Sequence, residues 1–287
     1  MTAIYKKEVR TYFTHMMGYV FLAFMTLLIG IFFSMTSVSG QNPNFQFVLT
    51  NITTFFFILI PVLTMRLFSE EARQKTDQLL FTSPLSVTQI VLGKFFAAFT
   101  LFLAAAAISV LFPVMVFTFG NLPVSQIIGA YIGFILIGAA CIAVGVFISV
   151  LTDNQIIAAV ATMGATFVMF IMDGIAMIMP TSALASFGFV GAVIVAVAAV
   201  LYNATKSKIA GAAALVLGLG ICGGLFLINN SVFDAVIVRV MLWFSIYTRF
   251  ANFALGVLNF NDIVYYISFT ALFIYFAVNV IEKRRWR

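Results

Sequence analysis

Residues 126–150 read QIIGAYIGFILIGAACIAVGVFISV and contain no charged side chain. Residues 95–119, FFAAFTLFLAAAAISVLFPVMVFTF, have the same character. Neither run alternates between apolar and polar residues, as the strands of a membrane β-barrel do. Each run also exceeds the roughly 20 residues that a helix needs to cross the hydrocarbon core of a bilayer. Both runs therefore predict transmembrane helices.

The whole chain shares this composition. Of its 287 residues, 63% are apolar and only 8% are charged, and the mean hydropathy is +1.16. A soluble domain carries about 25% charged residues, so this is not a soluble enzyme. The composition also excludes a disordered chain, a collagen and a nucleic-acid-binding protein, despite a net charge of +6. We expect an all-α polytopic membrane protein with one domain over 1–287 and no cleaved signal peptide.

Eight apolar segments are long enough to span a membrane, and the Lys and Arg residues between them give the orientation. Cytoplasmic segments near span ends carry the excess of these residues. If the N-terminus is cytoplasmic, only Arg239 and Arg249 of the fifteen Lys and Arg residues lie outside. We therefore expect a cell-membrane protein with both termini in the cytoplasm. The predicted spans are 17–37, 52–68, 95–119, 126–150, 156–178, 187–203, 209–228 and 263–281.

Two further segments have the apolar stripe of a helix that lies on a membrane surface. Residues 1–16 predict an interfacial elbow helix at the cytoplasmic face. Residues 231–260 predict an interfacial or re-entrant segment at the outer face, helical over roughly 232–247 and again near 249–257. A ninth span there is disfavoured because Asp234 and Arg239 are costly near a bilayer centre. The apolar face of the elbow comprises Ile4, Tyr5, Val9, Tyr12, Phe13 and Met16, and that of the outer segment Phe233, Val236, Ile237, Val240, Met241 and Phe244.

The longest polar stretch predicted inside the cell is 66–94, RLFSEEARQKTDQLLFTSPLSVTQIVLGK. Its i,i+4 charge pairs predict that a helix continues from the second span. The Thr82-Ser83-Pro84 run breaks that helix, and Ser86 with Gln89 forms a capping box that starts the next one. A permease driven by a soluble motor needs such a protruding element, but a solvated loop whose charges only fix topology is the alternative. The pairs are Arg66–Glu70, Glu71–Lys75 and Arg73–Asp77.

Three groups of residues resemble the type-2 permeases of ABC exporters, and the gliding-motility-type branch most closely. The resemblance covers about 1–125 and 240–287 well and the middle weakly. This chain departs from the family at Lys75-Thr76 and Gln78, where members carry Gly-Thr and then Glu. Members commonly have six spans, so 187–203 and 209–228 form an additional pair of unknown role. The matching groups are Lys6-Lys7-Glu8 with Tyr12-Phe13 and Gly18-Tyr19-Val20; Arg66-x-Phe68-Ser69-Glu70-Glu71 with Leu79-Leu80-x-Thr82-Ser83-Pro84-Leu85-Ser86 and Ile90-Val91-x-Gly93-Lys94; and Ser245-Ile246-Tyr247-x-Arg249-Phe250 with Asp262-Ile263-Val264-Tyr265-Tyr266 and Glu282-Lys283-Arg284-Arg285-Trp286.

The resemblance implies that 66–94 contains the coupling helix that contacts a separate ABC ATPase, which binds ATP and Mg²⁺. It also implies a second copy of the permease, export of a hydrophobic or amphipathic substrate, and a path walled by the first, second and fifth spans. An extracytoplasmic binding-protein-like subunit is a further expected partner, alongside membrane lipid. The coupling residues carried over are Glu70, Glu71, Arg73, Lys75, Thr76, Asp77, Leu79, Leu80, Thr82, Ser83 and Pro84.

No catalytic, cofactor or metal site is expected on this chain. The Gly93-Lys94 pair lacks the upstream glycine and the following Ser or Thr of a phosphate-binding loop. Asp173 and Pro61 are candidates for the path or its gate, because one is ionisable within a span and the other removes a backbone hydrogen bond there. A non-transporting scaffold that couples an ATPase to an extracytoplasmic partner remains an alternative. A secondary carrier is disfavoured, because neither a partnered midplane charge nor an inverted repeat is visible.

Overall fold

The computed structural model describes residues 1–14, 16–40, 44–76, 85–117, 123–205, 208–228 and 230–285. These residues form helices joined by short turns, with no β-strand among them. The prediction of an all-α protein is therefore confirmed for this part of the chain. The chain divides into two compact units, Met1–Phe170 with Ile246–Arg287, and Ile171–Ser245. Helix α10, Gln155–Ile178, begins in the first unit and ends in the second.

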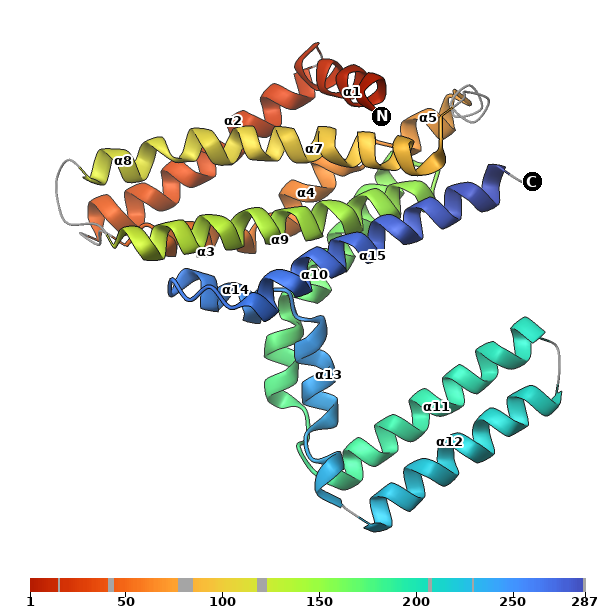
Figure 1. Cartoon of the computed structure of the whole chain (residues 1–287). Coiled ribbons are helices and arrows are strands. Elements are labelled where there is room, and N and C mark those ends of the chain that lie inside the picture. Colours follow the sequence, from red (N-terminus) through yellow and green to blue (C-terminus); the bar gives the residue numbers. More distant parts are fainter. Residues whose placement is uncertain are drawn as a thin grey trace. The chain divides into compact units, whose positions relative to one another are not determined.

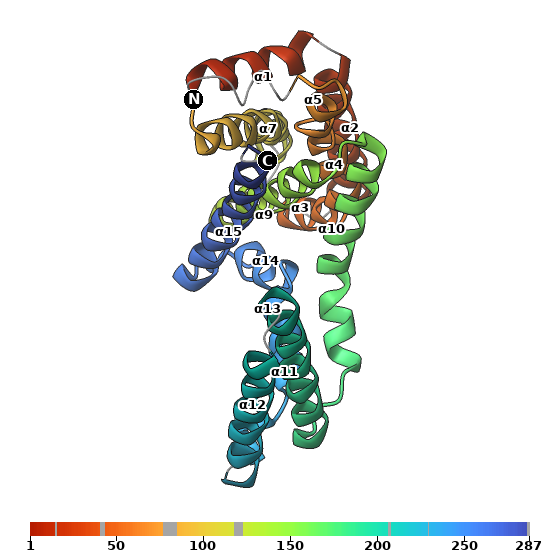
Figure 2. The same ribbon diagram turned by 90° about the vertical axis from the view of Figure 1, so that its right-hand side faces the viewer.

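Helix α9, Val124–Leu151, is the centre of the first unit (Figure 1). It carries buried residues on all its faces, because helices pack around it on several sides (Figure 2). A helix that is apolar all round is suited to this central position. Its neighbours are α3 (Gln46–Thr54), α4 (Phe56–Thr64), α7 (Val87–Ser109), α14 (Tyr247–Ala254) and α15 (Phe260–Arg285). The unit also contains α1 (Thr2–Thr14), α2 (Met16–Phe33) with a π-helical end (Ser34–Ser39), α5 (Ser69–Arg73) and α8 (Leu111–Phe117).

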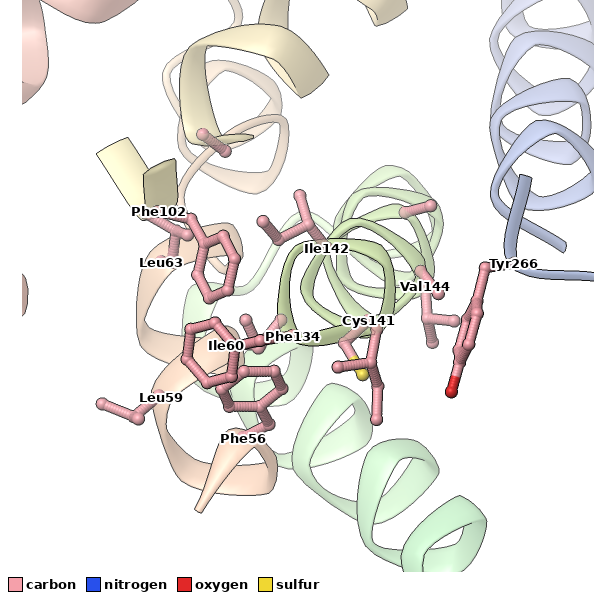
Figure 3. Packing of buried hydrophobic residues seen from close by; sticks show 14 of the residues in the cluster. Phe56, Leu59, Ile60, Leu63, Phe102, Phe134, Cys141, Ile142, Val144 and Tyr266 are labelled. Carbon is pink, nitrogen blue, oxygen red and sulfur yellow. The ribbon is translucent and has the colours of Figure 1, made fainter. Parts of the chain in front are cut away.

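Three aromatic rings join α4, α7 and α9 in the core of this unit (Figure 3). The ring centroids of Phe56, Phe102 and Phe134 lie 5.1–5.6 Å from one another. Rings at such distances gain about 0.5–1.5 kcal/mol per pair beyond their area burial. Gly138 makes room for this cluster, since a Cβ atom at that position would lie 2.3 Å from the Phe102 ring.

Two glycines allow α14 to approach α9 closely. A Cβ atom on Gly133 would lie 2.6 Å from that of Phe253, and one on Gly129 would lie 2.7 Å from the Phe253 carbonyl oxygen. The sequence pattern Gly129-x-x-x-Gly133 therefore does permit a close helix contact. By contrast, the Gly220-x-x-x-Gly224 pattern meets no neighbour within 4 Å in the described structure.

The second predicted span, 52–68, is broken near its start. Helices α3 and α4 meet at Phe55 with a bend of 63°. The Tyr247 hydroxyl of α14 donates a hydrogen bond to the Thr53 carbonyl at this break. A side chain that enters the backbone ladder in this way is a known cause of a sharp bend. The break therefore precedes Pro61 by more than a turn, and Pro61 itself lies buried within α4.

The second unit contains a helical hairpin, α11 (Ala183–Thr205) and α12 (Lys208–Ile228), followed by η2 (Asn230–Phe233) and α13 (Val236–Phe244). The rings of Phe187, Phe226 and Phe233 pack together with centroids 4.7–5.9 Å apart. They attach the hairpin to the segment that follows it. Helical structure is present in both predicted stretches. The stretch 232–247 contains η2 and α13, interrupted at Ala235, whose φ is 56°, and the stretch near 249–257 contains most of α14. The interfacial or re-entrant placement of this segment stays a prediction.

Only part of the predicted apolar face of the outer segment is buried. Phe233 and Ile237 are buried, whereas Val240 and Phe244 are exposed. Asp234 and Arg239 are also exposed, as expected for charged side chains.

In the first unit, α14 is joined to α15 by an ion pair between Arg249 and Asp262, with 3.0 Å between nitrogen and oxygen.

Five described helices are long and apolar enough to cross a membrane, and the bent pair α3–α4 gives a sixth span if it counts as one. These six correspond to predicted spans one to five and eight. The two remaining predicted spans correspond to α11 and α12, whose apolar stretches in the described residues, Ala183–Ala199 and Leu215–Phe226, are shorter. The prediction of eight spans is thus supported for six, and stays a prediction for the hairpin.

Candidate coupling site around Lys94

Helix α1 packs along the first half of α7. Ile4 is buried, and a Cβ atom on Gly93 would lie 3.1 Å from its Cγ2 atom. The Tyr5 and Thr100 hydroxyls are 3.0 Å apart. Glu8 is also buried on this face of α1, whereas Phe13 and Met16 are exposed. The segment predicted as an elbow is therefore helical, but its buried face includes a carboxylate and excludes two of the predicted apolar residues, and its place at the membrane surface stays a prediction.

That carboxylate belongs to a cluster centred on Lys94 of α7, whose side chain is only 1% exposed. The Lys94 ammonium lies 2.7 Å from a carboxylate oxygen of Glu71 and 3.3 Å from one of Glu8. It also donates a hydrogen bond to the Leu67 carbonyl. The Phe68 ring centroid is 4.8 Å from the ammonium, within range of a cation–π interaction. A buried charge requires partners of this kind to offset its lost hydration.

Lys7 of α1 is the second cation of the cluster. Its ammonium lies 3.1 Å from Glu71 and 3.6 Å from Glu8. Burial lowers the pKa of Lys7, but the charge of Glu71, its hydrogen bond and the contribution of Glu8 outweigh that effect and raise the pKa above its ordinary value. The cluster thus contains two carboxylates and two ammonium groups, whose formal charges sum to zero. These groups come from α1, α7 and the segment containing α5.

The start of α5 is held by its neighbours. Arg66 binds Glu70 through two hydrogen bonds of 2.6 and 2.7 Å, which confirms the predicted i,i+4 pair. This pairing raises the pKa of Arg66. The Ser149 hydroxyl, near the end of α9, accepts the backbone N–H groups of Phe68 and Ser69 at 3.1 and 3.3 Å. Free N–H groups at a helix start need such acceptors, so α9 fixes where α5 begins.

The predicted helix that continues from the second span is wrong, because α4 ends at Thr64 and α5 begins only at Ser69 and extends no further than Arg73. Helix α5 ends there, and Lys75 has a φ of 56°, in the left-handed region that a right-handed helix does not contain. The predicted Glu71–Lys75 pair is also wrong, because Glu71 turns instead toward Lys94 and Lys7. The capping prediction is confirmed, since the Ser86 side chain accepts the backbone N–H of Gln89 where α7 begins.

The predicted coupling residues divide into two groups. Among the described ones, Glu71 joins the Lys94 cluster, Glu70 binds Arg66, and Arg73 and Lys75 are exposed. The Thr76 backbone N–H binds the Glu71 carbonyl at 3.0 Å. The others, among them the predicted partner of Arg73, lie outside the described residues: Asp77, Leu79, Leu80, Thr82, Ser83 and Pro84.

The two path candidates belong to different units. Pro61 is buried in α4 of the first unit. Asp173 is partly buried near the end of α10, in the second unit.

The sequence interpretation missed Lys94 and Glu8 as members of a site. A lysine about two turns inside an apolar helix was a usable signal, and so was the placement of Glu8 at i+4 from Ile4 and i−4 from Tyr12.

Comparison with known families identifies this architecture. Residues 32–196 match the family model described as ABC-2 family transporter protein. The chain belongs to the ABC-2 family. The match includes the whole of α5, α7 and α9 and reaches into α11, so it covers Glu71 and Lys94 of the cluster. No curated protein and no solved structure matches the chain.

Membership in the ABC-2 family makes this chain a multi-pass membrane permease subunit of an ABC transporter, and it implies an ABC ATPase as partner. The Lys94 cluster ties three segments of such a permease together at one end of its first unit. Because a buried ion pair is costly to break, the cluster holds these three segments to one another.

Proposed function

We propose that this chain is the membrane subunit of an ATP-driven exporter of the gliding-motility-type branch, and that its 66–94 segment docks the ATPase. The observation that carries the proposal is the Lys94 cluster. It connects the start of this segment, through Glu71, to α1 and α7. A motion of the ATPase against the segment would therefore reach two helices of the permease directly.

The proposed sidedness places both termini and the 66–94 segment in the cytoplasm of a cell. Its support is the charge distribution, with only Arg239 and Arg249 of fifteen Lys and Arg residues on the opposite side. The Lys94 cluster then lies at the cytoplasmic boundary of the membrane. ATP and Mg²⁺ are bound by the partner ATPase and not by this chain.

A second copy of the chain is proposed to complete the transport path. Helix α3 exposes Thr50 and Asn51, two polar residues within an apolar span. Polar side chains in a span ordinarily face other protein or a water-filled cavity and not lipid. The exposed face of α3, together with α2, α4 and α10, therefore suits a path between two copies. Its mainly apolar surface favours a hydrophobic or amphipathic substrate.

A scaffold that only transmits force to an extracytoplasmic partner is the second candidate. It is favoured by the exposed aromatic end of α13, where Trp243 is 52% and Phe244 is 44% exposed. Such a surface also suits a binding-protein-like subunit of a transporter. ATP-dependent movement of a hydrophobic dye across proteoliposomes that contain only the permease and the ATPase would favour the exporter, and its absence the scaffold.

Docking of the ATPase can be tested by substitution within the segment. Leu79→Asp with Leu80→Asp replaces two apolar side chains, whose removal from a packed contact costs several kcal/mol, about 2–5 for each leucine. We expect the variant to lose the ATPase during purification. The ATPase is identified by mass spectrometry, from the peptide that contains its phosphate-binding loop. The matched control is Met177→Asp with Ile178→Asp, an adjacent pair that is 88% and 84% exposed. Retention of the ATPase by the Leu79/Leu80 variant would refute the proposed docking site.

A further inference from the structure

A groove runs along the first unit between α7 and α15, with α9 as its floor. These three helices run side by side (Figure 1). The groove has a volume of about 580 Å³, within the ~300–1,000 Å³ that is usual for small-molecule sites. Its middle is apolar, and its lining includes Phe95, Phe96 and Phe99 of α7, Ala139 of α9, and Ala271 and Ile274 of α15.

The lining of the groove becomes polar at one end. Thr88 of α7 and Asn279 and Glu282 of α15 line it there. Glu282 also borders a second hollow, which it shares with Ser86 and Arg285. This end lies at the start of α7 and the last turn of α15. The groove thus has an apolar middle and a polar end, and that end carries one carboxylate, one guanidinium and several uncharged polar groups.

The charged groups at this end are available to a ligand. In the described part of the chain, neither Glu282 nor Arg285 forms an ion pair, and both side chains are exposed. The Ser86 oxygen accepts the Gln89 N–H, which leaves the hydroxyl proton to be donated. The end of the groove therefore offers donors for an anion beside an acceptor for a cation.

We propose that this groove binds one phospholipid with a phosphoethanolamine headgroup. An acyl chain lies along the apolar faces of α7 and α15, where it removes aromatic surface from contact with disordered lipid. Arg285 and the Ser86 hydroxyl bind the phosphate, and Glu282 with the Asn279 carbonyl oxygen accepts hydrogen bonds from the primary ammonium. Because the end of the groove offers charge-assisted bonds of both signs, the proposal expects a zwitterionic headgroup to bind more strongly than an anionic one.

This lipid site is separate from the proposed transport path. The path is assigned to α2, α3, α4 and α10, whereas the groove is formed by α7, α9 and α15. Since α7 also carries Lys94, a lipid held against its first turns would stabilise the helix that bears the coupling cluster. The site does not depend on which substrate the permease carries.

Native mass spectrometry of the full-length permease in detergent tests the proposal. Phosphatidylethanolamine, phosphatidylcholine and phosphatidylglycerol are titrated separately, and the fraction of chains that retain one lipid is measured. We expect phosphatidylethanolamine to be retained most strongly. Phosphatidylcholine should bind more weakly, because its quaternary ammonium donates no hydrogen bond to Glu282.

Two variants separate the headgroup contacts. Arg285→Gln should weaken all three lipids, by about tenfold for one charge-assisted hydrogen bond. Glu282→Gln should abolish the preference for phosphatidylethanolamine over phosphatidylcholine. Lys283→Gln is the matched control, because it removes a charge from the same turn of α15 without lining either hollow, and it should leave the preference unchanged.

A third variant tests the apolar middle of the groove. Ala271→Trp fills the groove and should reduce retention of phosphatidylethanolamine, whereas Ala107→Trp, at an exposed position of α7 outside the groove, should not. The proposal is overturned if both tryptophan variants retain the lipid equally or if the wild type does not distinguish the three headgroups. It is also overturned if Ala271→Trp instead dissociates a dimer, since a second copy would then occupy the groove. Loss of the ATPase would leave lipid retention intact. A failure of the proposed function can therefore be distinguished from a failure of the proposed lipid site.

Discussion

Lys94 lies about two turns inside an apolar helix, yet it is the most buried charged residue in the described part of the protein. Glu8, Glu71 and the Leu67 carbonyl surround it. A buried ion pair of this kind is only weak support for high stability, because desolvation offsets much of the attraction. Removal of one partner is nevertheless costly, since the charge that remains is buried without compensation. The cluster therefore fixes an arrangement more than it adds stability.

Gly138 shows how tightly the core of the first unit is packed. A Cβ atom there would lie 2.3 Å from the Phe102 ring, so Gly138→Ala must displace that ring from its contacts with Phe56 and Phe134. We expect a loss of about 1–3 kcal/mol, the usual cost of overpacking, measured as a lower midpoint of thermal unfolding in detergent.

Gly188→Ala is the matched control for this substitution. Nothing lies within 4 Å of a Cβ atom at Gly188 in α11. Alanine should there be neutral or stabilising by up to about 0.5–1 kcal/mol, because glycine is a poor helix former. Equal midpoints for the two variants would mean that Phe102 does not pack over Gly138 as described.

At the scale of elements, α1 and the first half of α7 should move as one body. A Cβ atom on Gly93 would lie 3.3 Å from that of Ile4, close to the ~3.5–4.5 Å of a disulfide. We expect Ile4→Cys with Gly93→Cys to form a disulfide on oxidation, with little effect on ATP hydrolysis by the complex. The bond is detected on a gel after the chain is cleaved by a protease between the two positions, because the disulfide then keeps the two fragments together.

The reduced form of the same variant is the control for the cross-link. If oxidation stops ATP hydrolysis and reduction restores it, α1 must move relative to α7 during the cycle. That outcome would contradict a rigid connection between these two helices.

The sequence predicts elements that depend on local patterns. The spans follow from length and hydropathy, the start of α7 from Ser86 and Gln89, and the outer helices from an apolar stripe. The Lys94 cluster follows from no local pattern, because its two carboxylates come from distant parts of the chain. The bend at Phe55 follows from no local pattern either, since the Tyr247 hydroxyl that binds the Thr53 carbonyl beside it comes from α14, far away in the sequence. Pro61, the local signal, lies elsewhere in the span.

At the scale of the whole molecule, the α11–α12 hairpin decides the topology. If it crosses the membrane, the chain has eight spans and residue 207 lies in the cytoplasm, opposite residue 230. We expect Asn230→Cys, in a chain with Cys141→Ala and Cys222→Ala, to react with an impermeant maleimide in whole cells. Ser207→Cys should react only after the membrane is opened.

The reverse pattern, with Ser207→Cys labelled and Asn230→Cys protected in intact cells, would refute the eight-span arrangement. Labelling of both positions in intact cells would place the entire hairpin outside and leave six spans. In either case the assignment to the ABC-2 family stands, because the match over residues 32–196 is one of sequence and does not depend on which side of the membrane the hairpin lies.

The central claim is that ATP hydrolysis by the partner is coupled to the permease through the Lys94 cluster. The most direct measurement is the rate of ATP hydrolysis by the complex in proteoliposomes, with wild-type permease and with Lys94→Met. We predict that Lys94→Met keeps the ATPase bound but lowers the rate to that of the isolated ATPase, while the exposed Lys283→Met control hydrolyses ATP as the wild type does. A Lys94→Met complex that stays intact and hydrolyses ATP at the wild-type rate would contradict the account.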